Sequence, residues 1–259
     1  MIEFDEQFLT HLETYHQSAS ALAKRERYLT MLNPMPGQQI LDLGCGGGDF
    51  CRVLAPLVSP GGQVTGVDLS PDAVTLATRS SDSTESGFLA FEQGDGHDLR
   101  FADRSFDAAT CISVLGYCQD PGRVLSELRR VLRQGGRLLL VNSDEEARSY
   151  SGSEGELGKR VMRAIATRGR APRIGRRLIH VLKDNGFHVL QEEVLSGVER
   201  HYSPGAAGYT LAHILREYLV ESGAVSAEEY ERWLTELAAR AREGSYAYSS
   251  RTLAYLTRV

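Results

Sequence analysis

The sequence predicts an α/β fold built on a doubly wound, mostly parallel sheet. Between residues 38 and 143, short apolar runs alternate with amphipathic helical patterns, and such alternation requires right-handed crossovers between parallel strands. A glycine-dense turn follows the first apolar run, and acidic residues end the next two. Because ligands of doubly wound sheets bind at the carboxyl ends of the strands, these features predict one binding site at that edge.

Composition narrows the possible partners. The chain has 259 residues, is 42% hydrophobic and carries a net charge of −5, so it can bury one large core with a smaller appendage and has no global basic field for nucleic acid. The four cysteines lack Cys-x-x-Cys spacing, which favours reduced thiols over disulfides or a metal site. With no run of about 18 apolar residues and a charged N-terminus, we expect a soluble, cytoplasmic protein that does not enter a membrane.

The glycine-dense turn is typical of a cofactor-binding loop. Gly44, Gly46 and Gly48 occupy alternate positions, where a missing β-carbon lets the backbone approach a ligand and adopt positive φ. The dinucleotide fingerprint needs glycine at position 49, where Asp49 stands, and Asp42 adds a second carboxylate that would repel a pyrophosphate. A ligand with a cationic head and a ribose, such as S-adenosylmethionine, tolerates both acids.

Asp68 supports the same ligand. It ends the second apolar run, 20 residues after Gly48, where an acid can accept hydrogen bonds from ribose hydroxyls. The pattern Asp-x-Gly-x-Gly-x-Gly at positions 42–48 resembles the class I S-adenosylmethionine-dependent methyltransferases. The resemblance covers residues 38–143: it includes Gly94-Asp95-Gly96 after the third strand, Phe-Asp at the start of the fourth, and a helix, double glycine and strand over 121–142.

The resemblance implies S-adenosylmethionine as cofactor and S-adenosylhomocysteine as product. It assigns the ribose to the acid that ends the second strand and the adenine amino group to the acid that ends the third. The residues that it places around the cofactor are Asp42, Gly44, Cys45, Gly46, Asp68, Leu69, Gly94, Asp95, Gly96 and Cys111.

The elements follow in order. A single helix is expected over 4–32, and a helix over 50–58 follows the glycine turn; Ser70 and Asp120 each precede a proline and predict helix starts. We expect a seven-stranded sheet whose last strand is antiparallel. The predicted strands are 39–43, 63–68, 88–93, 105–113, 137–142, 187–195 and 246–258, with a further helix over 174–183.

Residues 197–244 separate the last two strands. They contain helical patterns over 205–222 and 227–242, the second opened by a capping signature at Ser226-Ala-Glu-Glu. The insertion is similar to the substrate caps of the ubiquinone and menaquinone C-methyltransferase-like branch and its natural-product relatives. We therefore expect an N-terminal cap segment (1–37), a core (38–196 with 245–259) and a helical lid (197–244); a packing or oligomer role for the insertion is the alternative.

The acceptor is expected to be a small molecule, because the chain lacks both the Asn/Asp-Pro-Pro-aromatic motif of nucleobase amine methylation and the Pro-Cys nucleophile of cytosine-C5 enzymes. Methyl transfer from a sulfonium needs alignment more than a covalent nucleophile. If a general base is used, the candidates near the strand ends are His97, Tyr117, Asp144 and His201.

Two other functions are compatible with the sequence. The chain could bind S-adenosylmethionine without methyl transfer, or use the bound sulfonium for a rearrangement or cyclisation. Seven arginines and no acid lie between Arg160 and Arg177, which indicates either a solvated surface or a patch for an anionic partner. The sequence does not decide the oligomeric state, and a homodimer is one of the alternatives.

Overall fold

The computed structural model describes residues 6–81 and 88–259, and within these ranges it contains one eight-stranded mixed sheet. The strand order is β3-β2-β1-β4-β5-β8, with β7 along the other side of β8 and the two-residue β6 pairing with the start of β8. The strands are β1 (Gln39–Leu43), β2 (Gln63–Asp68), β3 (Leu89–Gln93), β4 (Phe106–Ile112), β5 (Leu132–Ser143), β6 (Ser149–Tyr150), β7 (His188–Glu199) and β8 (Tyr248–Arg258). The predicted fold is confirmed, including the antiparallel last strand between β5 and β7.

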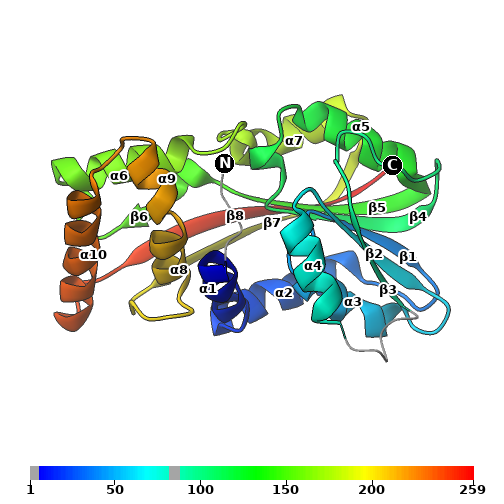
Figure 1. Cartoon of the computed structure of the whole chain (residues 1–259). Coiled ribbons are helices and arrows are strands. Elements are labelled where there is room, and N and C mark those ends of the chain that lie inside the picture. Colours follow the sequence, from blue (N-terminus) through cyan, green and yellow to red (C-terminus); the bar gives the residue numbers. More distant parts are fainter. Residues whose placement is uncertain (1–5, 82–87) are drawn as a thin grey trace.

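Helices cover both faces of this sheet (Figure 1). The α-helices are α1 (Glu6–His16), α2 (Ala19–Leu32), α3 (Asp49–Val58), α4 (Pro71–Arg79), α5 (Pro121–Val131), α6 (Glu156–Thr167), α7 (Ile174–Asp184), α8 (Ala207–Ile214), α9 (Arg216–Glu221) and α10 (Ala227–Arg242). Two short 3₁₀ turns, η1 (Leu115–Tyr117) and η2 (Glu145–Ala147), follow β4 and β5. Within the described ranges, no helix combines the length and apolarity needed to cross a lipid bilayer.

Two hydrophobic clusters fill the space on either side of the sheet. Alternation along β1 sends Ile40 to one cluster and Leu41 to the other. The first cluster packs the sheet against α5 and α7, and the second packs it against α2 and α3, as the two layers in Figure 1 show. Parallel register then aligns the strand ends: Leu43 of β1 pairs with Val67 of β2 and Cys111 of β4. The residues that follow these strands therefore meet at one edge.

A third hydrophobic cluster lies at the end of the molecule where β8 begins. It joins α6, α8, α9 and α10 around the buried Trp233, Tyr150 and Tyr248. Figure 1 shows these helices grouped beyond the edge of the main helical layers. The capping box predicted at Ser226 and Glu229 is present and begins α10.

Several boundaries differ from the predictions. The N-terminal segment forms two helices, because Ser18 caps a new helix by accepting a hydrogen bond from the Ala21 amide; residues 4 and 5 of the predicted helix lie outside the described residues. The pattern over 205–222 is broken at Leu215 into α8 and α9. Strand β7 extends to Glu199 because it pairs with β8 along its whole length. Helix α6 and strand β6 were not predicted.

Candidate functional site

The glycine loop is held against β2 and is open on its other side. The amides of Gly44 and Cys45 donate to the Val67 carbonyl oxygen at 2.7 and 3.1 Å. Gly44, Gly46 and Gly48 all have positive φ, as predicted from their spacing. A β-carbon on Gly44 would lie 2.1 Å from the Val114 side chain, whereas one on Gly46 would meet no atom within 4 Å. The loop therefore leaves ligand space above Gly46.

Asp68 organises this loop as well as facing the ligand space. One carboxylate oxygen accepts from the Gly46 amide and the other from the Ser70 amide, both at 2.9 Å. Each oxygen keeps a second lone pair, so hydroxyl donors of a ribose can still be bound. The next side chain, Leu69, is 65% exposed and offers an apolar surface for a flat ring. These groups fit the adenosine part of S-adenosylmethionine.

The third strand end forms a turn braced by a histidine. Asp95 accepts from the His97 amide at 2.9 Å and from His97 Nδ1 at 2.6 Å, while the Asp120 amide donates to His97 Nε2 at 3.3 Å. The hydrogen bonds from His97 hold the pKa of Asp95 below its usual range. Because both ring nitrogens of His97 have partners, His97 positions Asp95 against the start of α5 and is not a free base. Gly94 and Gly96 flank Asp95, and a β-carbon on either would approach Val67 or Leu43 closely.

Asp42 lies beneath the loop and is fully engaged by the protein. It is 3% exposed, and its two oxygens accept from Thr110 Oγ1 at 2.5 Å and Cys51 Sγ at 3.2 Å. Burial raises the pKa of this carboxyl. Cys45 and Cys111 are likewise buried in the two core clusters. The side chains of these three predicted cofactor residues are thus buried within the protein.

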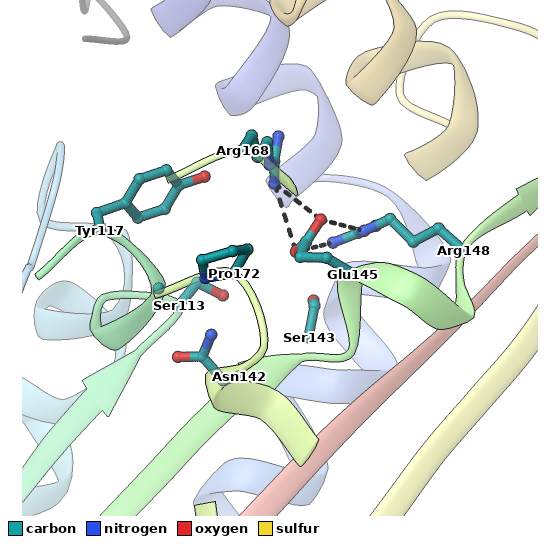
Figure 2. Close-up of a pocket in the computed structure, with 9 residues that line it drawn as sticks. Ser113, Tyr117, Asn142, Ser143, Glu145, Arg148, Arg168 and Pro172 are labelled. Carbon is teal, nitrogen blue, oxygen red and sulfur yellow. Dashed lines mark hydrogen bonds and ion pairs between the residues drawn. The ribbon is translucent and has the colours of Figure 1, made fainter. Parts of the chain in front are cut away.

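A pocket lies beside the ends of β4 and β5. Ser113, directly after β4, has a φ of 62° and donates its amide to the Val141 carbonyl at 2.8 Å. This left-handed conformation is uncommon for a serine and is stored strain of the kind found at binding sites. The pocket is lined by Ser113, Gly116, Tyr117, Asn142, Ser143, Glu145, Arg148, Arg168 and Pro172, and most of these side chains converge in Figure 2.

Of the four predicted catalytic candidates, only Tyr117 lines this pocket. Asp144 is 2% exposed and pairs with Arg176 at 2.9 Å and with Arg251. Burial alone would raise the pKa of Asp144, but these two guanidinium groups hold it below its usual range, so Asp144 is an ion-pair centre and a poor base. His201 is exposed in the segment that follows β7.

Sequence reasoning pointed to Tyr117 but missed three other polar residues of the pocket lining, Asn142, Glu145 and Arg148. Asn142 is 5% exposed, and its Oδ1 has no hydrogen-bond partner among the described residues. Glu145, Arg148 and Arg168 form a charged group above it (Figure 2). The sequence did contain one signal for this charged group. The acidic residues 144–146 carry negative charge that can pair with the arginine run over 160–177, which contains no acid of its own.

Four of the seven arginines in this run form ion pairs with described residues of the chain. Arg160 pairs with Glu229, Arg173 with Glu146, and Arg176 with both Asp144 and Glu146. These ion pairs tie α6 to α10 and the start of α7 to η2. They favour the interpretation of the run as structural surface over a patch for nucleic acid.

The N-terminal helices reach the glycine loop. His16, at the end of α1, lies with Nδ1 2.7 Å from a carboxylate oxygen of Asp49, whose other oxygen accepts from Arg52 at 2.8 Å. In the middle of α1, the centre of the His11 ring lies 5.4 Å from that of His213 on α8. Helix α1 therefore connects the cofactor loop to the insertion between β7 and β8.

Comparisons with known proteins identify the kind of domain that the chain contains. A methyltransferase domain model matches residues 41–140. A Streptomyces fradiae protein from transposon TN4556, itself uncharacterised, is 33% identical over 233 residues, covering 89% of this chain and 66% of that protein. The 2-phytyl-1,4-naphtoquinone methyltransferase of Synechococcus elongatus is 38% identical over 108 residues, covering 41% of this chain and 46% of that enzyme. The chain thus spans less than two thirds of the length of these relatives.

Solved structures share the fold over nearly the whole chain. A Bacillus halodurans C-125 protein assigned to the methyltransferases has a TM-score of 0.62 at 18% identity, covering 91% of this chain and 98% of that one. The [4+2]-cyclase SpnF has a TM-score of 0.56 at 21% identity, covering 90% and 80%. Residues 41–140 therefore match a methyltransferase domain, and this part of the chain is similar to the quinone C-methyltransferase-like branch of the class I S-adenosylmethionine-dependent methyltransferases.

Proposed function

We propose that this protein transfers a methyl group from S-adenosylmethionine to an oxygen, nitrogen or carbon atom of a small-molecule metabolite. The observation that carries the proposal is the meeting of three groups at one edge of the sheet. These are the open space at Gly46, the Asp68 carboxylate beside the exposed Leu69, and the Asp95 turn. The relatives suggest an acceptor of quinone or natural-product type.

The protein's part in such a reaction is mainly alignment. When bound, S-adenosylmethionine supplies a methyl group on a positively charged sulfur, which is displaced in line. Asp68 would hold the ribose hydroxyls and Asp95 the adenine amino group. A cation placed above the buried Asp42 would favour its ionised form, which would then contribute negative charge below the cationic end. Holding the two reactants in near-attack geometry, away from water, is the largest contribution such a site can make.

The acceptor would enter through the pocket beside Ser113. That pocket now holds about 50 Å³, room for a few water molecules, whereas small-molecule sites usually span about 300–1,000 Å³. We therefore propose that α1, α2 and the segment between β7 and β8 act as a cap that moves to admit the acceptor. The contact of His16 with Asp49 and that of His11 with His213 support a cap that covers the cofactor loop.

The test combines binding with turnover. Calorimetry should show binding of S-adenosylmethionine and S-adenosylhomocysteine, and incubation with a metabolite extract should produce S-adenosylhomocysteine together with a methylated product. Binding with no turnover of any extract would favour a binding protein. A changed acceptor without S-adenosylhomocysteine would favour a rearrangement or cyclisation, and tight binding of NAD instead would overturn the choice of cofactor.

A further inference from the structure

The pocket beside Ser113 contains a buried charge cluster that methyl transfer itself does not require. Arg148 and Arg168 both contact Glu145, at 2.8 Å and 3.4 Å respectively. None of the three side chains is more than 13% exposed. Burying charges in this way costs free energy unless each one is paired. Glu145 is ionised, because the two arginines outweigh its burial and hold its pKa below the usual range.

The cluster has an unbalanced positive charge. The pocket lining contains two guanidinium groups and one carboxylate, which leaves one excess positive charge. The acids next to Glu145 in sequence do not neutralise it, because Asp144 pairs with Arg176 and Arg251 and Glu146 pairs with Arg173 and Arg176.

The excess charge is located on Arg168. Arg148 makes two bonds to Glu145, at 2.8 and 3.1 Å, and a third to the Tyr248 hydroxyl. Arg168 reaches Glu145 only at 3.4–3.5 Å, and within residues 6–81 and 88–259 it has no other ion pair. A guanidinium carries five N–H donors, so most of those on Arg168 are free for a ligand.

Two neighbours fix where that ligand would lie. The Arg168 guanidinium carbon is 5.9 Å from the centre of the Tyr117 ring, a cation–π distance that orients the charged group. Figure 2 shows the Tyr117 side chain directed toward Arg168, with Asn142 at the opposite side of the pocket. The unpartnered Asn142 Oδ1 needs a hydrogen-bond donor, and leaving it unmade is costly.

We propose that the methyl acceptor is a monoanion whose carboxylate binds Arg168 and whose hydroxyl or amino group donates to Asn142. The proposal rests on the proposed function, since it names the acceptor class of the same site. A carboxylate matches the planar fork of a guanidinium and balances the single excess charge, whereas a phosphate dianion would leave the pocket negative.

The experiment uses radiolabelled S-adenosylmethionine and a metabolite extract separated by anion exchange into anionic and non-anionic pools. A portion of the anionic pool is treated with carbodiimide and methylamine, which converts carboxylates to neutral amides and leaves inorganic and organic phosphates anionic. The wild-type protein should label the untreated anionic pool and should lose at least 90% of that labelling with the amidated portion.

Arginine variants test whether labelling of the anionic pool depends on Arg168. Arg168→Gln should lower labelling of the anionic pool at least tenfold, and Arg168→Lys should restore part of it. Arg163 is an exposed arginine on α6, the helix that Arg168 follows, and Arg163→Gln should match the wild type. Calorimetric affinity for S-adenosylhomocysteine should stay within twofold in all of them, which separates loss of acceptor recognition from misfolding.

The outcomes are distinct. Labelling confined to the non-anionic pool, labelling that survives amidation, or full activity of Arg168→Gln would overturn the carboxylate proposal while leaving methyl transfer in place. Labelling of no pool by a protein that binds S-adenosylhomocysteine would instead overturn the proposed function itself.

Discussion

Replacing Asp68 tests whether one carboxylate both shapes the loop and binds the cofactor. Asp68→Ala removes two hydrogen bonds to the amides of Gly46 and Ser70. Hydrogen bonds to a charged group contribute about 1.5–3 kcal/mol each. Because Asp68 is only partly buried and the freed amides can bind water, we expect the free energy of unfolding to fall by about 1–3 kcal/mol.

The loss of cofactor affinity should be comparable or larger. The variant also loses its bonds to the ribose hydroxyls and no longer fixes the Gly46 amide, so the binding free energy should weaken by about 2–3 kcal/mol, or roughly 30- to 150-fold in Kd. Asp68→Asn keeps one acceptor oxygen and should lie between the wild type and Asp68→Ala.

Calorimetry with S-adenosylhomocysteine, paired with urea unfolding, measures both quantities. Asp72→Asn is the matched control, because Asp72 is an exposed acid in the first turn of α4, near Asp68 in sequence. If Asp68→Ala unfolds cooperatively and binds S-adenosylhomocysteine within twofold of the wild type, the cofactor does not lie where the strand ends meet.

Four further outcomes are expected. Gly44→Ala places a β-carbon 2.1 Å from Val114 and should lower the free energy of unfolding by about 2–4 kcal/mol. Gly46→Ala should lower it by only about 1 kcal/mol but should weaken S-adenosylhomocysteine binding at least tenfold. Equal behaviour of the two variants in urea unfolding and calorimetry would contradict the loop geometry. Asn142→Asp removes the excess positive charge of the pocket, so labelling of the anionic pool should fall at least tenfold in the radiolabel assay while cofactor affinity is retained. Burial holds the pKa of His213 below its usual value. As pH falls below about 6.5, this histidine is therefore protonated more readily in the unfolded chain than in the folded one, which favours unfolding. The free energy of unfolding should drop more steeply between pH 7 and 5 in the wild type than in His213→Phe. In hydrogen exchange followed by mass spectrometry, amides of α1 and α8 should exchange faster than those of β1 and β4, and equal protection would argue against a cap that opens.

The meeting of the glycine loop with the strand-end acids could be predicted because its signals are local. Glycines at alternate positions and acids at strand ends are visible in the sequence, and parallel topology alone brings them to one edge. The same locality explains two successes in the helices, the caps at Ser70 and Ser226, where a hydroxyl and the amide it binds are three residues apart.

The pocket beside Ser113 could not be predicted, since it depends on contacts between distant segments. Arg168 contacts Glu145 and Tyr117 only because the fold places the end of α6 beside the ends of β4 and β5. The arginine run in the sequence does not show which of its members lacks a close ion-pair partner. Asp144 was expected to be available as a base, but Arg176 of α7 and Arg251 of β8 form ion pairs with its carboxylate. In the N-terminal segment, apolar spacing continued through the break at Ser18, so periodicity indicated one helix.

The buried Asp42 has a thermodynamic consequence for ligand uptake. In the free protein its pKa is raised by burial beneath the glycine loop, so its ionised form is disfavoured there. A positively charged ligand placed above it favours the ionised form and lowers that pKa. By linkage, binding then releases a proton at pH values between the two pKa values, and affinity for the cation increases as pH rises through that interval. The neutral thioether product lacks the sulfonium charge and should release fewer protons, so substrate and product differ in the heat they exchange with buffers of different ionisation enthalpy. A carboxyl buried beneath the glycine loop would thus help the site to distinguish the sulfonium from the thioether.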